Sequence, residues 1–335
     1  MKLKNFILCL GIALVMAGAD CLVAKAPQAA LLINIIFWLA IAQGAVALVA
    51  VADLTQARWV VPVKKDLFAL IPLIPVFALL FLFVAPQWGI YPKIIKQSAW
   101  FDQWFFVVRN AIFLLIAWLF AWKYSRVSLQ NSENKGLWAV LYLLSFVTMQ
   151  SVVAFNWVMP LHFPWVSTLF GAYFFIEALY MGIGFGTVIC LVNLERAGDS
   201  KPKELVKTGY DIGLLLFGFC ILWMSLFFTH LMIIWYGNIP EEQALYITIA
   251  QHYSPAHWIV LACLFGVPFV TLPFRKVKSD PKAVVVVAGV VFVGMLLEKW
   301  LMFVPAATIS YPALAIHFAF MAAMAFLTMK AHYRS

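Results

Sequence analysis

The chain has 335 residues, of which 65% are hydrophobic and 11% are charged, whereas ordinary soluble domains hold about 45–50% apolar and about 25% charged residues. This composition excludes an ordinary soluble domain and indicates a membrane protein. The formal net charge of +9 requires no nucleic-acid partner, because a bias of basic loops towards one side of the membrane and attraction to anionic lipids account for it.

Apolar segments long enough to cross a membrane recur along almost the whole chain. A hydrocarbon core of about 30 Å takes roughly 20 helical residues. We predict an all-α integral membrane protein that forms a single domain over residues 1–335. Its roughly ten transmembrane helices are expected at about 5–24, 29–52, 66–85, 101–122, 136–157, 168–193, 209–236, 254–273, 283–304 and 311–329. The first segment has some features of a secretory signal, but Pro27 would directly follow the cleavage site, so we interpret it as a span.

The basic residues predict the orientation of the spans. Loops rich in Lys and Arg stay in the cytoplasm. With cytoplasmic N- and C-termini, the opposite side of the membrane carries only Lys25, Lys93 and Lys96, and Arg109 and Lys299 lie within spans. All the other Lys and Arg residues fall on the cytoplasmic side.

The five cysteines lie in apolar spans and form no C-x-x-C or C-x-x-C-H motif. We therefore expect this chain to hold no metal, iron–sulfur cluster or covalent haem of its own. His230 and His317 fall in the same half of the membrane. They are a pair that a haem could use, although buried histidines that pack in a protein core are more common.

Ionisable residues inside the spans are candidates for function, because a charge in lipid costs a few kcal/mol or more. The topology places all of them near the midplane or in the extracytoplasmic half. Asp102 lies at the mouth of the fourth span. The residues within the spans are Asp20, Arg109, Glu177, His230, Glu298, Lys299 and His317.

Two polar stripes suggest a route for protons. Tyr173, Glu177, Tyr180 and Gly184 share one face of the sixth span. A second stripe on the seventh span consists of Asp211, Gly218, Ser225 and Thr229. Facing stripes can hold a file of water, whereas the structural alternative is hydrogen bonding between helices. The candidates for a proton pathway are Glu177, Tyr173, Tyr180, Asp211, Ser225, Thr229, His230, Asp102, Arg109, Glu298 and Lys299.

Two ion pairs between spans are further predictions. Glu298 is the expected partner of Arg109, and Asp20 is the expected partner of Lys299; a structural pair and a transport role are equally consistent with the sequence. The glycines of "MGIGFG" (Met181 to Gly186) lie within a span and are interpreted as residues of close helix contact rather than a dinucleotide-binding motif.

The segment "IIWYGNIPEE" (Ile233 to Glu242) ends the seventh span. Trp235 and Tyr236 are typical of the aromatic belt at a membrane surface. Gly237 or Asn238 can adopt the left-handed conformation that caps a helix, and Pro240 prevents its continuation.

Three segments of the chain resemble a known family. They are "YDIG" (Tyr210 to Gly213) with the following "LLLFGFCILWMSLFFTHLMIIWYGNIPEE", "FNWVMPLHFPWVSTLFGAYFF" (Phe155 to Phe175), and "FWLAIAQGAVAL" (Phe37 to Leu48). This combination is similar to the ActF membrane subunits of bacterial Alternative Complex III, within the NrfD-like superfamily. The sequence departs from that family's pattern at Asn156 and His162, where acids are expected, and at His230, where Gln is expected.

The resemblance implies two four-helix bundles, made by spans two to five and six to nine, plus peripheral helices in a bacterial cytoplasmic membrane. It implies an integral, non-redox subunit of a complex that oxidises menaquinol or ubiquinol and reduces cytochrome c or a similar acceptor. Haem c and iron–sulfur clusters would belong to partner subunits, beside a second, quinol-binding NrfD-like subunit. Lipids are expected partners, and quinone is expected nearby.

Three functions fit the sequence. The first is anchoring of such a complex with proton translocation, in which Glu177 is the principal relay. In the second, the chain itself oxidises quinol, with His230 or Glu177 accepting the proton. The third is a stand-alone secondary transporter whose charged cluster binds its substrate.

Overall fold

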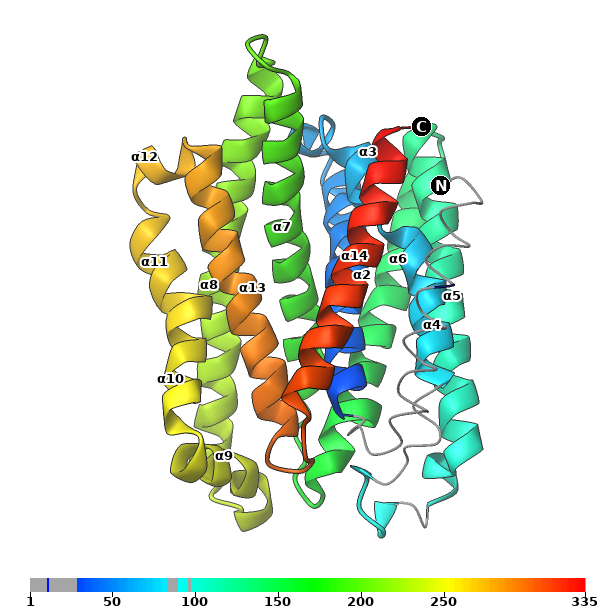
Figure 1. Cartoon of the computed structure of the whole chain (residues 1–335), viewed down its shortest axis with the longest axis vertical. Coiled ribbons are helices and arrows are strands. Elements are labelled where there is room, and N and C mark those ends of the chain that lie inside the picture. The colour runs from blue at the N-terminus through cyan, green and yellow to red at the C-terminus, as the bar shows by residue number, and fades with distance from the viewer. Residues whose placement is uncertain (1–10, 12–28, 83–89, 96–97, 335) are drawn as a thin grey trace.

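The computed structural model describes residues 11, 29–82, 90–95 and 98–334 (Figure 1). Over these residues the chain is all-helical, without a β-strand. Nine helical segments in this part are long and apolar enough to cross a membrane, which indicates a multi-pass membrane protein. They confirm the second to tenth predicted spans. The first predicted span, 5–24, lies outside the described residues, as do Asp20, Lys25 and Lys96.

The spans are built from one or several helices each. The single-helix spans are α2 (Ala29–Leu54), α5 (Gln103–Leu129), α7 (Phe170–Arg196), α8 (Lys203–Gly237), α13 (Pro281–Phe303) and α14 (Tyr311–Tyr333). The composite spans are α3 (Lys64–Leu67), η2 (Ile71–Leu73) and α4 (Ile74–Leu82); α6 (Lys135–Val152), η6 (Val153–Val158) and η7 (Met159–His162); and α10 (Ser254–Leu261), η8 (Ala262–Gly266) and α11 (Val267–Thr271). The connecting helices are η1 (Arg58–Val60), η5 (Ala99–Phe101), α9 (Pro240–His252) and α12 (Arg275–Lys278).

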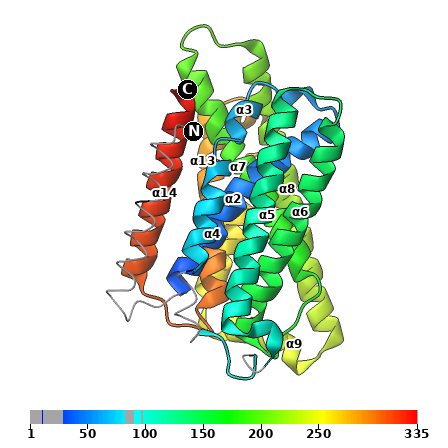
Figure 2. The same ribbon diagram turned by 90° about the vertical axis from the view of Figure 1, so that its right-hand side faces the viewer.

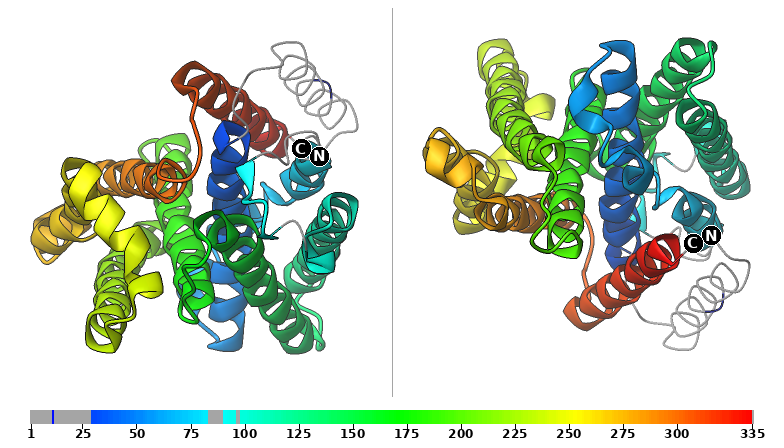
Figure 3. Two further views of the ribbon diagram at one scale, coloured as in Figure 1. Left: turned by 90° about the horizontal axis from the view of Figure 1, so that it is seen from below. Right: turned by 90° about the horizontal axis from the view of Figure 1, so that it is seen from above.

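Helix α2 runs through the middle of the bundle (Figure 3). It contacts α4, α6, α7, α13 and α14, and 89% of its most apolar stretch is buried. A Cβ atom on Gly44 would lie 1.7 Å from the carbonyl oxygen of Ala178 on α7, and one on Gly182 would lie 2.2 Å from the carbonyl carbon of Gly44. The two backbones therefore touch at these glycines, which confirms Gly182 as a residue of close helix contact.

The end of α8 agrees with the sequence prediction. The helix ends at Gly237, and Asn238 takes the left-handed conformation with φ of 50°. Pro240 then begins α9, whose buried residues are Leu245 and Ile249. We did not predict this helix, because 13 residues with only two buried apolar side chains form a weak pattern.

The two ends of the bundle carry different elements (Figures 1 and 2). The short helices α3 and α12 lie at one end with the C-terminal end of α14, and α9 lies at the opposite end. Lys64 and Lys65 belong to α3, and α12 has the sequence RKVK. We call these the basic end and the α9 end. That the basic end faces the cytoplasm stays a prediction.

Candidate functional site

A buried ion pair joins α7 to α13. The Nζ of Lys299 donates a hydrogen bond to Oε2 of Glu177, and each side chain is 1% exposed. The ammonium group also lies 3.9 Å from the ring centre of Phe174. Burying a charged group costs several kcal/mol unless it is paired, so the lysine and the glutamate stabilise each other. Lys299 therefore pairs with Glu177, and the predicted pair with Asp20 falls on a residue outside the described part of the chain.

A second carboxyl group adjoins this pair. Glu298 precedes Lys299 on α13 and is also buried. Tyr173, one turn before Glu177 on α7, donates its hydroxyl to Oε1 of Glu298. The carboxyl groups of Glu298 and Glu177 lie next to each other. The site thus brings two acids and one lysine together, and we call Glu177, Glu298 and Lys299 the carboxyl cluster.

The carboxyl cluster needs one proton. Glu177 Oε1 and Glu298 Oε2 are buried and receive no hydrogen bond from any donor in the described part of the chain. Two ionised carboxylates in contact repel each other, and only a protonated carboxyl group can donate. One proton shared by the two acids makes the cluster neutral with Lys299, which lowers the cost of its burial. A single proton between the two acids is therefore the arrangement that best fits their burial and their unbonded oxygens.

His230 and Tyr246 continue the polar region towards the α9 end. His230 Nδ1 lies 3.1 Å from the hydroxyl of Tyr246 on α9. The imidazole ring centre is 6.5 Å from that of Tyr173 and 6.0 Å from that of Trp165. Tyr173 therefore lies between the carboxyl cluster and His230, and Tyr246 lies beyond the imidazole.

Tyr246 is the site residue that sequence reasoning missed. Burial, together with the nearby charges of Glu298 and Glu177, raises the pKa of its phenol well above the usual range. The hydroxyl is therefore protonated at neutral pH and can exchange a hydrogen bond with His230. The only available signal was its position in the sequence, one residue after Leu245 and three residues before Ile249, the two buried apolar residues of α9.

A groove of about 710 Å³ lies between α8 and α9. It is mostly apolar, and its lining includes Phe228, Leu231 and Ile247. Tyr246 and Asn238 contribute polar groups. Tyr246 both lines this groove and contacts His230, so the groove lies next to the polar region.

The other residues of the two predicted stripes lie elsewhere. The hydroxyl of Tyr180 donates to the carbonyl oxygen of Leu264 at 3.1 Å, a bond between helices. Ser225 and Thr229 face outwards and are exposed, and the Thr229 hydroxyl donates to the Ser225 carbonyl oxygen. The prediction of a water file along this face of α8 is therefore wrong, because the buried face of the helix carries residues such as Trp223 instead.

Asp211 lies near the opposite end of α8 from His230, the residue of this helix that adjoins the polar region of the carboxyl cluster. It is half-buried and lines a pocket of about 680 Å³ with Arg58, Glu204 and Lys207. Asp211 is close to the N-terminal end of a helix of 35 residues. At about 1.5 Å per residue, its distance from His230 along the axis is roughly 28 Å.

Arg109 and Asp102 have structural partners. The guanidinium group of Arg109 lies 3.8 Å from the ring centre of Trp100 and donates to the Trp100 carbonyl oxygen at 2.8 Å. Asp102 is exposed and caps α5 by accepting a hydrogen bond from the backbone N–H of Phe105. The predicted pair of Arg109 with Glu298 is therefore wrong, since the guanidinium group stacks on an aromatic ring of η5 and donates to a carbonyl oxygen of η5, whereas Glu298 contacts Tyr173.

The positions that depart from the family pattern are also bonded. Asn156 accepts a hydrogen bond from the Trp100 indole at 3.2 Å, and His162 Nε2 lies 2.6 Å from the Met302 carbonyl oxygen. His317 is buried on α14, which the views place on a different side of α13 from α8, the helix of His230 (Figures 1 and 3). In the described part of the chain, no group of three or more His, Cys, Asp or Glu residues is placed to hold a metal ion.

These features define the chain as a helical, multi-pass membrane protein with a buried polar site between α7 and α13. A scan of protein-family models finds no match to the sequence, and a search of curated proteins finds none. The function therefore has to be argued from the residues.

Proposed function

We propose that this chain is an ActF-like integral subunit of a quinol-oxidising complex in a bacterial cytoplasmic membrane. It anchors the redox subunits and exchanges protons through the carboxyl cluster. The observation that carries the proposal is the excess of one acid over the single buried lysine. An ion pair of one acid and one lysine would have no proton to exchange. A second carboxyl group that holds a proton can release it and bind it again.

The segments that resemble the family support this proposal by their positions. The segment Phe155 to Phe175 contributes Trp165 and Tyr173 to the site, and the segment Leu214 to Glu242 contributes His230. Helices α2, α4, α5 and α6 contact one another, and so do α7, α8, α10 and α13 through a chain of contacts. We propose that these two sets of helices are the two four-helix bundles that the resemblance implies, with α2 and α7 in contact between them.

The proposed proton exchange is one-sided. Tyr173, His230 and Tyr246 extend from the carboxyl cluster towards the α9 end, which the positive-inside rule assigns to the extracytoplasmic face. Towards the basic end, Asp211 is the next predicted relay, and it lies at the far end of α8. The cluster therefore serves as the inner end of a half-channel, and the relay is the pair of acids rather than Glu177 alone.

The redox groups are proposed to belong to other subunits. Iron–sulfur clusters, haem c and a quinol-binding NrfD-like subunit would carry electrons from menaquinol or ubiquinol to a cytochrome c or similar acceptor. This chain would supply the membrane anchor and the proton site. Lipids would surround the exposed apolar faces of α8, α10 and α11.

Copurification tests the assignment to a complex. We expect a detergent particle containing this chain to show c-type haem absorption and iron–sulfur signals in the same fraction. Purification of the chain alone from its native membrane, without redox subunits, would contradict the proposal and favour the stand-alone transporter.

Substitution of the acids tests the proton site. Glu177→Gln and Glu298→Gln should each keep the haem content of the particle and lower proton release during quinol oxidation at least tenfold. Thr229→Ala on the exposed face of α8 is the matched control, and it should leave proton release unchanged. If both Gln variants release protons as the wild type does, the carboxyl cluster has only a structural role.

Quinol binding by this chain is a second candidate function, favoured by the groove between α8 and α9. Its volume of about 710 Å³ and apolar lining fit the isoprenoid chain and ring of a quinone. His230, held by its hydrogen bond with the Tyr246 hydroxyl, would accept the quinol proton. A photoreactive quinone should label α8 or α9, and Ile247→Trp should block the labelling. Labelling confined to another subunit of the particle would exclude this function.

A further inference from the structure

A second polar site lies at the basic end, far from the carboxyl cluster. A pocket of about 600 Å³ opens between the C-terminal end of α2, the segment that precedes α3, and the connection from α5 to α6. Its lining includes Asp53, Arg58, Lys64, Lys65 and Lys135. Four cations therefore surround one acid.

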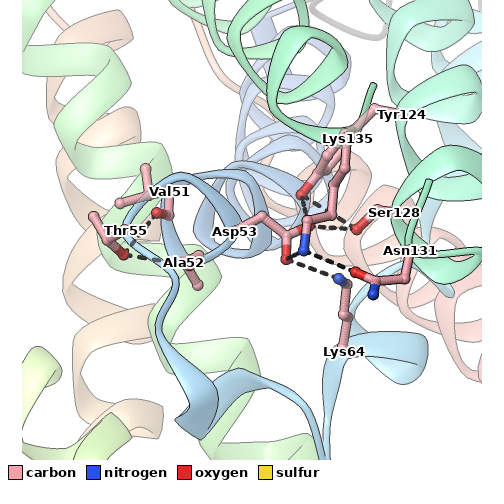
Figure 4. Close-up of polar contacts among 9 residues, drawn as sticks. All are labelled: Val51, Ala52, Asp53, Thr55, Lys64, Tyr124, Ser128, Asn131 and Lys135. Carbon is pink, nitrogen blue, oxygen red and sulfur yellow. Dashed lines mark hydrogen bonds and ion pairs between the residues drawn. The ribbon is translucent and has the colours of Figure 1, made fainter. Parts of the chain in front are cut away.

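Both carboxylate oxygens of Asp53 accept hydrogen bonds from neighbouring side chains (Figure 4). Its Oδ1 accepts from Lys64 Nζ at 2.8 Å, and Lys135 Nζ lies 3.6 Å away. Its Oδ2 accepts from the hydroxyl of Tyr124 at 2.7 Å and from that of Ser128. The carboxylate therefore fixes the two lysines in place and has little capacity left to bind a metal ion.

Arg58 and Lys65 have acidic residues nearby but form no direct ion pair with any residue in the described ranges of the chain. The charge of Lys65 acts on Asp66, and Arg58 also lines the neighbouring pocket with Glu204 and Asp211. With Asp53 offset by one lysine, the pocket keeps an excess of positive charge that an anion would neutralise. An arginine beside lysines is a common arrangement for binding a phosphate group.

The rim of the pocket combines unusual backbone with apolar side chains. Gln56 and Asn131 both line it and have φ of 55° and 51°. Non-glycine residues in this conformation are uncommon and cluster at ligand sites. Val61 and Leu129 also line the pocket and are 64% and 50% exposed. The cations therefore stand beside apolar surface near the C-terminal ends of α2 and α5.

We propose that this pocket binds the phosphate of an anionic phospholipid. Arg58 and Lys65 would contact the phosphate oxygens, with Lys64 and Lys135 held behind them by Asp53, and the acyl chains would lie along Val61 and Leu129. Basic pockets at the cytoplasmic ends of transmembrane helices suit such headgroups. A free phosphate ion would satisfy the same cations but would make no use of the apolar rim.

The test uses the full-length chain purified in detergent and a fluorescent phosphatidylglycerol probe. The variant Arg58→Gln/Lys65→Gln removes the two unpaired cations, and Arg275→Gln/Lys276→Gln on α12 removes the same charge at the same end of the bundle. We expect the first variant to bind the probe about 30-fold more weakly and the second to change binding by less than about threefold. Phosphatidylcholine should not compete with the probe.

Two further measurements keep the proposal falsifiable. Inorganic phosphate in tenfold excess over the lipid should not displace the probe, and Leu129→Gln should weaken binding severalfold without removing charge. Displacement by phosphate alone would instead assign the pocket to a free anion. Equal loss of binding in both double variants would mean that the probe responds only to the overall surface charge. Each of these two results would overturn the lipid site.

Discussion

Two groups of acids and lysines, one in the interior of the bundle and one at its basic end, stabilise their charges differently. Asp53 faces partly exposed lysines and has a hydrogen-bond donor for each oxygen. Glu177 and Glu298 share one fully buried lysine and each keep a carboxylate oxygen without a donor among the described residues. A satisfied network fits a structural or binding role, whereas proton exchange is our proposal for the site that has one more acid than it has cations.

Loss of the buried lysine should have the largest effect. Lys299→Met leaves two buried acids without a cation, so we expect a loss of about 3–5 kcal/mol in the free energy of unfolding in mixed micelles. Lys64→Met, the matched change at the basic end, should cost about 1 kcal/mol or less, because Asp53 keeps three other polar neighbours. Adding Glu177→Gln to Lys299→Met should restore most of the loss. Equal costs for Lys299→Met and Lys64→Met would remove the distinction between the two sites.

Substitution of the acid at the basic end should have an intermediate effect. Asp53→Asn keeps the shape of the side chain but loses the charge that holds Lys64 and Lys135. We expect a loss of about 1–3 kcal/mol in the free energy of unfolding and no change in proton release. A large loss of proton release with unchanged stability would mean that Asp53, and not the carboxyl cluster, handles protons.

The smallest effects are expected on α8 and α9. Tyr246→Phe removes the hydrogen bond to His230 and should cost about 1 kcal/mol in the free energy of unfolding, while slowing proton release. Thr229→Ala removes a hydroxyl that bonds only to its own helix, and it should stay within about 0.5 kcal/mol of the wild type. If the two variants have the same rate of proton release, Tyr246 lies outside the route.

Much of the fold follows from the sequence because the apolar segments are long and their boundaries are marked. Pro240 and Asn238 predicted the end of α8, and the glycines of "MGIGFG" predicted the close contact of α7. Helix α9 could not be predicted in the same way, since a short helix at a membrane surface needs few apolar residues. Tyr246 was missed with it.

The partners within the candidate site were harder to predict than its members. The sequence places Glu177, Glu298 and Lys299 in spans, but it does not determine which faces of α7 and α13 are turned towards each other. Arg109 was assigned to Glu298 on charge alone, whereas its guanidinium group packs against the ring of Trp100 in η5. Ser225 and Thr229 share a helix face with Asp211, yet that face is turned outwards at their level.

The shared proton of the carboxyl cluster is the central claim, and infrared spectroscopy of the full-length protein tests it most directly. At neutral pH the wild type should show the carbonyl stretching band of a protonated carboxylic acid that resists exchange with solvent. Because the cluster needs the proton only when both acids are present, Glu177→Gln and Glu298→Gln should each abolish the band, and Asp53→Asn should retain it. Absence of the band in the wild type, or its survival in both Gln variants, would contradict the account.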